Sequence, residues 1–156
     1  MKVAVITVDT EVYKGNKEDL AGKAITEFLE EMEGASVVFT KALPSDKKIL
    51  STILQRMSDG EMADLILTTG GAGCAPDDIT PEATMEIVEK PVLGIPEAMR
   101  AFTLQKTNRA MINRSAAGIR NKSLIVNLPG KEKAVILTLK YLYEVIEHAV
   151  TVIQGK

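Results

Sequence analysis

Three closely spaced glycines follow an apolar run in the middle of the chain. The run Leu65–Thr68 ends at Thr69, and Gly70, Gly71 and Gly73 come directly after it. Because glycine lacks a Cβ, such a loop can turn sharply and bring backbone N–H groups close to a phosphate. The pattern therefore predicts a buried strand that ends in a phosphate-binding loop. A tight strand-to-helix connection without a ligand is the alternative that the same spacing leaves open.

Two carboxylates, Asp77 and Asp78, lie a few residues beyond these glycines. A carboxylate beside a phosphate is unfavourable unless a cation lies between them, and Mg²⁺ takes one or two carboxylates together with phosphate oxygens and water. The segment therefore indicates a magnesium-dependent phosphate or nucleotide site. The alternative role of either aspartate is a solvated loop charge or a helix cap. The spacing matches neither a Walker loop nor a dinucleotide-binding fingerprint.

The elements that must position this loop alternate between β-branched runs and helical periodicity, which predicts a largely parallel sheet with crossover helices. The expected strands are Lys2–Val8, Ser36–Phe39, Leu65–Thr68 and Ser123–Asn127. The expected helices are Leu20–Met32, one capped by Ser45 and ending near Met57, a short one with Thr80 as cap and Pro81 in its first turn, Gly94–Thr103, and about Lys131–Ile153.

Three distinctive loops follow strand ends in this scheme. They are residues Asp9–Asp19, Thr69–Pro81 and Asn127–Gly130. In sheets of this kind, ligands bind beyond the carboxyl ends of the strands. We therefore expect the three loops to converge on one cleft.

Composition limits the class of protein. With 156 residues and 46% hydrophobic content, the chain can bury the core of one domain, which we place at residues 1–156. A net charge of −2 gives no electrostatic case for nucleic acid or an anionic membrane. One cysteine excludes an intrachain disulfide, no signal-peptide pattern is visible, and no apolar stretch reaches the roughly 20 residues of a membrane span. We expect a soluble, cytoplasmic protein.

Two further motifs place the glycine loop in a family context. They are Asn113–Arg120 (NRSAAGIR) and Ile125–Ala134 (IVNLPGKEKA). Together with the glycine and aspartate segment, and in this order, they resemble the molybdenum-cofactor biosynthesis domain of the molybdopterin adenylyltransferase family. The resemblance covers nearly the whole chain.

The resemblance implies an α/β three-layer sandwich in which helices flank a mainly parallel sheet. It also implies ATP- and Mg²⁺-dependent adenylylation of molybdopterin, with release of pyrophosphate. ATP and molybdopterin are then the substrates and Mg²⁺ is the cofactor. A homotrimer or hexamer, and a downstream protein that inserts the metal, are the implied partners.

The resemblance also assigns roles to individual residues. The implied catalytic and metal-binding carboxylates are Asp78 and Asp46. The implied nucleotide and phosphate contacts are Thr69, Gly70, Gly71, Gly73, Thr80 and Arg114. The implied molybdopterin contacts are Ser115, Ala116, Gly118, Asn127, Pro129 and Gly130. Arg120 is a second candidate for neutralising phosphate charge, and pairing with a surface carboxylate is its alternative role.

Two departures from the family pattern leave other functions open. Ser45 stands where relatives carry the first aspartate of a Pro-Asp-Asp or Pro-Asp-Glu motif, and Glu11 stands near a position where relatives often carry arginine. A molybdopterin-binding relative with weakened catalysis, acting as carrier or scaffold, is therefore the main alternative. A nucleotide-processing domain like that of nicotinamide-nucleotide amidases, and an oligomeric structural protein without a ligand, are two further ones.

Overall fold

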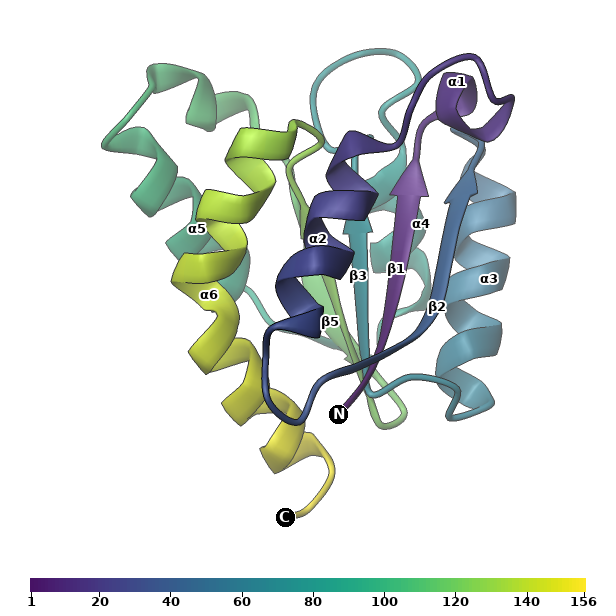
Figure 1. The fold of residues 1–156 in the computed structure, drawn as a ribbon, viewed down its shortest axis with the longest axis vertical. Helices are drawn as coiled ribbons and strands as arrows, with labels where there is room; N and C mark the ends of the chain where they lie inside the picture. Colours follow the sequence, from purple (N-terminus) through teal and green to yellow (C-terminus); the bar gives the residue numbers. More distant parts are fainter.

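A six-stranded mixed sheet forms the middle layer of the protein (Figure 1). The computed structural model describes all 156 residues. The strands are β1 (Lys2–Val8), β2 (Ser36–Leu43), β3 (Leu65–Thr69), β4 (Lys90–Pro91), β5 (Ala117–Arg120) and β6 (Ser123–Leu128). Their order is β2-β1-β3-β6-β5-β4, in which the first four are parallel and the last two are antiparallel to their neighbours. The predicted mainly parallel sheet is confirmed.

Helices cover both faces of this sheet. They are α1 (Thr10–Tyr13), α2 (Leu20–Glu30), α3 (Lys47–Asp59), α4 (Thr80–Ile87), α5 (Gly94–Leu104), the 3₁₀ helix η1 (Asn108–Ile112) and α6 (Glu132–Ile153). Helices α2, α5 and α6 pack on the face that is nearer in Figure 1, whereas α3 and α4 pack on the far face. The three-layer sandwich that the sequence predicts is therefore the observed fold.

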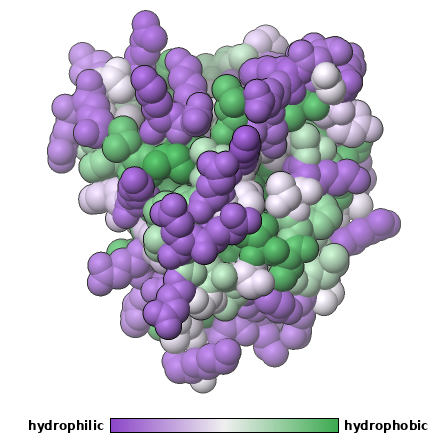
Figure 2. Space-filling model, viewed as in Figure 1, coloured by the Kyte–Doolittle hydropathy of each residue, from purple (hydrophilic) through white to green (hydrophobic).

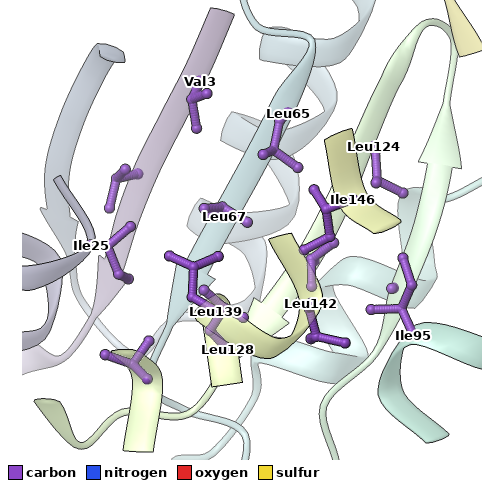
Figure 3. Close-up of a cluster of buried hydrophobic side chains, with 14 of the residues drawn as sticks. Val3, Ile25, Leu65, Leu67, Ile95, Leu124, Leu128, Leu139, Leu142 and Ile146 are labelled. Carbon is purple, nitrogen blue, oxygen red and sulfur yellow. The ribbon is translucent and has the colours of Figure 1, made fainter. Parts of the chain in front are cut away.

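Two hydrophobic cores lie on either side of the sheet because its central strands are buried on both faces. Side chains alternate between them: Leu65 and Leu67 face α6, and Ile66 between them faces α3 and α4. Figure 3 shows Leu65 and Leu67 beside Leu139, Leu142 and Ile146 of α6. Every residue of β3 and β6 is buried, so these strands form a rigid centre for the loops at their ends.

Two predicted helix caps are wrong. Asp46, and not Ser45, caps α3, because its Oδ1 accepts a hydrogen bond from the amide of Ile49 at 2.9 Å. Helix α4 starts one residue earlier than predicted: Ile79 is its cap position, and the Thr80 hydroxyl donates to the carbonyl of Gly70. In both cases the observed cap position is the residue next to the predicted one.

The carboxyl ends of β1, β2, β3 and β6 lie at one edge of the sheet, at the top of Figure 1, and both chain termini lie at the other end. The loops after β1, β3 and β6 therefore meet above the sheet. None of the helices, including the 22-residue α6, is long and apolar enough to cross a membrane.

Candidate active site

Two adjoining cavities lie around the glycine loop at the carboxyl edge of the sheet. The larger has a volume of about 450 Å³ and the smaller about 320 Å³. Gly70, Gly71, Asp78 and Gly130 line both. The three loops that the sequence predicts to converge thus contribute to one divided cleft.

The glycine loop has a backbone shape that other residues adopt only with strain. Gly70 and Gly71 have φ of +90° and +69°. A Cβ on Gly70 would lie 2.7 Å from the carbonyl oxygen of Val8, and one on Gly71 would overlap the hydroxyl of Thr80. Thr80 closes the loop, since its amide donates to the Gly71 carbonyl at 2.9 Å and its hydroxyl to the Gly70 carbonyl at 2.8 Å. Only glycine therefore fits this part of the cleft floor.

The loop is also tied to the segment after β6. The hydroxyl of Thr69 donates to the carbonyl of Pro129 at 2.6 Å, which places Pro129 and Gly130 against the glycines. Thr69 lines the larger cavity, but the residue is fully buried and its hydroxyl is occupied by the bond to Pro129, so its predicted phosphate contact stays a prediction. The bond fixes the distance between the two loops that line the smaller cavity.

Asp78 occupies the boundary between the cavities. Its Oδ2 accepts a hydrogen bond from the amide of Ala75 at 2.9 Å, and its Oδ1 has no partner within the protein. One carboxylate oxygen thus orients the side chain while the other is free to bind a ligand in the cleft. Asp77 is exposed and lines only the larger cavity.

The larger cavity is strongly acidic. Asp9, Glu11, Asp77 and Asp78 line it, and no lysine or arginine does. Burial raises the pKa of Asp9, but the ammonium group of Lys17 at 3.0 Å and the amides at the start of α1 outweigh it and hold that pKa below its usual value. A polyphosphate entering this cavity without a cation would meet four carboxylates, of which only Asp9 is paired with a cation.

The donor set of the larger cavity fits Mg²⁺ delivered with a nucleotide. No group of three histidine, cysteine, aspartate or glutamate side chains is arranged to hold a metal by itself. Mg²⁺ does not require one, because it is held by one or two carboxylates, with substrate phosphates and water completing six oxygen ligands. The free oxygen of Asp78 and the hydroxyls of Thr10 and Ser45 provide hard donors in the same cavity.

Arg114 holds the glycine loop through hydrogen bonds to its backbone, and it does not line either cavity. Its Nε donates to the carbonyl of Gly73 at 2.6 Å, and its Nη2 donates to the carbonyl of Asp78 at 2.8 Å. The carboxylate of Glu82 pairs with the same guanidinium. This hydrogen bond raises the pKa of Arg114 and lowers that of Glu82. In this geometry Arg114 positions the glycine loop, and its predicted phosphate contact stays a prediction.

The ion pair between Arg114 and Glu82 predicts that the free energy of unfolding depends on pH. The folded-state pKa of Glu82 lies below its ordinary value of about 4.5, so its ionisation contributes stability above that pH and loses the contribution as pH falls through the folded-state pKa. Both side chains are more than one third exposed, which limits the effect to below about 1 kcal/mol. Urea unfolding between about pH 5 and pH 3 should show a shallower loss for Glu82→Gln than for the native chain. Equal losses of stability in the two proteins would contradict a stabilising role of the Arg114–Glu82 pair.

Several predicted molybdopterin contacts lie away from the cavities. Asn127 is fully buried, and its side chain bonds to Thr68, Thr84 and the amide of Ala116. Ser115 is also buried, and its hydroxyl has no hydrogen-bond partner. Gly118 lies in β5 with the side chain of Val88 directly against it. Among the predicted molybdopterin contacts, the structure brings only Pro129 and Gly130 to the cleft.

Ser45 and Asp46 take different positions. Ser45 lines the larger cavity, and its amide donates to the hydroxyl of Thr10 at 3.0 Å, which fixes α1 beside it. Asp46 caps α3 and does not line either cavity. Arg120 pairs with Asp59 at the surface, as its alternative role predicts. This pair lowers the pKa of Asp59 and raises that of Arg120.

Sequence reasoning missed some residues of the cleft. Thr7 and Thr10 line the larger cavity, while Arg109, Ile112 and Asn113 line the smaller. Thr7 lies near the end of the predicted strand Lys2–Val8 and Thr10 lies in the loop after it, and this position at the carboxyl end of a strand could have identified both. Arg109 and Ile112 gave none, because they reach the cleft only through the unpredicted helix η1.

An α/β sheet with a glycine loop and carboxylates at the carboxyl edge defines a domain built to bind phosphorylated ligands. A family model described as "Probable molybdopterin binding domain" matches residues 4–148, and the chain belongs to this family.

Individual relatives agree with this family. Molybdopterin adenylyltransferase from Helicobacter pylori strain J99 is 40% identical over 154 residues, covering 98% of this chain and 88% of the relative. The structure of the molybdopterin biosynthesis enzyme MoaB from Thermus thermophilus superposes with a TM-score of 0.90 at 37% identity, covering 99% of this chain and 97% of the other. The Mog protein from Mycobacterium ulcerans gives a TM-score of 0.90 at 32% identity, covering 97% and 98%.

Proposed function

We propose that residues 1–156 form a single molybdopterin adenylyltransferase domain that acts in molybdenum cofactor biosynthesis. The observation that carries this proposal is the 40% identity to adenylyltransferases over nearly the full length, in a chain whose glycine loop and Asp78 share one cleft. ATP and molybdopterin are the substrates. Their reaction joins AMP to the terminal phosphate of molybdopterin and releases pyrophosphate.

The cleft residues serve this reaction mainly by alignment. An oxygen of the molybdopterin phosphate attacks the α-phosphorus of ATP, and the bond to the pyrophosphate group breaks. The backbone of Gly70 and Gly71 lies between the two cavities, so its amides are placed to hold the phosphates that react. Asp78, oriented by Ala75, is the carboxylate that would hold Mg²⁺ through its free oxygen. Mg²⁺, when bound, neutralises phosphate charge and orients the leaving group.

Pyrophosphate release from Mg-ATP and freshly prepared molybdopterin tests the proposal. We expect release by the native chain, and we expect Ser45→Asp to change its rate by less than about tenfold, because four carboxylates already line that cavity. The alternative function, a carrier or scaffold that binds molybdopterin with weakened catalysis, rests on Ser45. Release only from Ser45→Asp would favour that alternative.

We also propose that the chain assembles as a homotrimer or hexamer and passes its product to a metal-insertion protein. Leu137, Tyr141 and Val145 are each about half exposed and four residues apart on α6. Figure 2 shows hydrophobic residues among hydrophilic ones on the face of the molecule that α2 and α6 cover in Figure 1. Burial of these three side chains between copies of the chain would support such an assembly. Sedimentation velocity measures the number of copies in it. A cytoplasmic location stays a prediction.

A further inference from the structure

We propose that Arg109 binds the phosphate group of molybdopterin in the smaller cavity. The inference rests on the proposed function, because that function supplies the phosphorylated substrate. It assigns to a residue outside the recognised motifs the cationic contact that the sequence places on Arg114. The step is one of binding and orientation, without a change in covalent bonds.

Arg109 is held at the rim of the smaller cavity by its own helix turn. Thr107 caps η1 by accepting a hydrogen bond from the Arg109 amide at 3.2 Å. Arg109 is exposed and lines a cavity that Gly70, Gly71 and Gly73 also line, and its guanidinium forms no salt bridge and donates no hydrogen bond within the protein. All of its donors are therefore available to a ligand.

The other arginines near the cleft are already committed. Arg114 bonds to two loop carbonyls and to Glu82, and Arg100 donates to the carbonyls of Asn113 and Ser115. Neither lines the two cavities, whereas Arg109 is the one lysine or arginine that does. A planar guanidinium with free donors suits a phosphate monoester, since it can contact two oxygens at once.

The charges of the two cavities direct different phosphates to different places. The larger cavity is lined by four carboxylates, of which only Asp9 is paired with a lysine, and by no lysine or arginine, so it suits a polyphosphate whose charge is neutralised by Mg²⁺. The smaller cavity contains Asp78 as its one carboxylate and has Arg109 along its edge, so it suits a phosphate monoester that carries no metal. Both cavities meet at Gly70 and Gly71, where the two phosphates would react.

The rest of the smaller cavity fits the heterocycle attached to that phosphate. Ile112 and Pro129 line it with apolar surface, and Ile112 is 56% exposed and therefore accessible to a ligand. A flat ring could pack on these side chains while Arg109 holds the phosphate. Arg109 would then set both the position and the direction of the attacking oxygen.

Equilibrium binding without ATP or Mg²⁺ tests the inference. The probes are molybdopterin kept under anaerobic conditions and the same pterin after removal of its phosphate by phosphatase. We expect Arg109→Ala to weaken binding of the phosphorylated pterin by about 10- to 100-fold and to leave binding of the dephosphorylated pterin unchanged. Arg109→Lys should fall between the native chain and Arg109→Ala, because lysine keeps the charge but not the paired donors.

Lys106→Ala is the matched control. Lys106 is exposed, lies three residues before Arg109, and its ammonium group sits over the ring of Phe102 outside both cavities. It should bind both pterins as the native chain does. If Lys106→Ala weakened binding of the phosphorylated pterin as much as Arg109→Ala does, the effect would come from the general positive charge of this surface, and the inference would be overturned. Unchanged binding of the phosphorylated pterin by Arg109→Ala would also overturn it.

Two outcomes separate this inference from the proposed function. If the native chain binds molybdopterin with the Arg109 dependence described but never releases pyrophosphate from Mg-ATP, the adenylyltransferase proposal fails and the phosphate contact stands. If the native chain binds molybdopterin and its dephosphorylated form equally well, the phosphate contact fails while pyrophosphate release can still support the enzyme.

Discussion

Asp78→Asn is expected to lower magnesium-dependent pyrophosphate release by about 100- to 1,000-fold. Asparagine keeps an oxygen that can accept the hydrogen bond from the Ala75 amide, so the loop should retain its shape. It removes the negative charge from a side chain that lines both cavities, and with it the carboxylate that we assign to Mg²⁺. The free energy of unfolding should change by less than about 1 kcal/mol.

Pyrophosphate release at several magnesium concentrations, with urea unfolding of the same samples, measures both effects. Glu86→Gln is the matched control, because it removes one carboxylate from α4, where Glu86 pairs with Lys47 away from the cleft. That variant should release pyrophosphate as the native chain does. An Asp78→Asn protein that turns over normally would remove Asp78 from the catalytic site. An Asp78→Asn protein that is unfolded would show that Asp78 has a structural role.

The central strands could be predicted from the sequence because their burial leaves a simple pattern. β1, β3 and β6 each contain a continuous apolar run, as expected of parallel strands covered on both faces; the runs are Val3–Ile6, Leu65–Leu67 and Leu124–Val126. β4 and β5 have only two and four residues, too few for periodicity to distinguish them from loops. Their antiparallel pairing depends on contact with β6, which no local pattern records.

The location of the cleft could also be predicted from the sequence, but the roles of the charged residues around it could not. Glycines and carboxylates at strand ends indicate where a phosphorylated ligand would bind, because strand direction brings those ends together. Which arginine is free is decided by tertiary partners. Arg114 lies within the Asn113–Arg120 motif yet is bound to Glu82, whereas Arg109 lies outside the motifs and its guanidinium has no partner within the protein.

Asn127 shows the same limit for a residue inside a motif. The resemblance implies a molybdopterin contact, but the side chain is fully buried between β3, α4 and the segment before β5. Its Nδ2 donates to the hydroxyls of Thr68 and Thr84 at 3.0 and 2.9 Å, and its Oδ1 accepts from the amide of Ala116 at 3.0 Å. A motif can thus mark a core polar link that holds the site together.

Asn127→Ala should therefore destabilise the fold by about 3 kcal/mol. The substitution leaves the half-buried Ala116 amide without an acceptor and the hydroxyls of the two buried threonines without their donor, and it opens a small void. Thr84→Val removes one of the three bonds with nearly unchanged volume and should cost about 1 kcal/mol. Urea unfolding of both variants gives the two free energies.

The comparison with ligand binding decides between the two roles of Asn127. If the amide serves the core, both variants lose stability in the proportion given above, and folded Asn127→Ala binds molybdopterin within a fewfold of the native chain, because the side chain does not reach either cavity. If Asn127→Ala keeps its stability and loses molybdopterin, the amide must turn toward the cleft when the ligand binds. The role implied by the family resemblance would then be correct, and the buried hydrogen bonds would describe only the ligand-free arrangement.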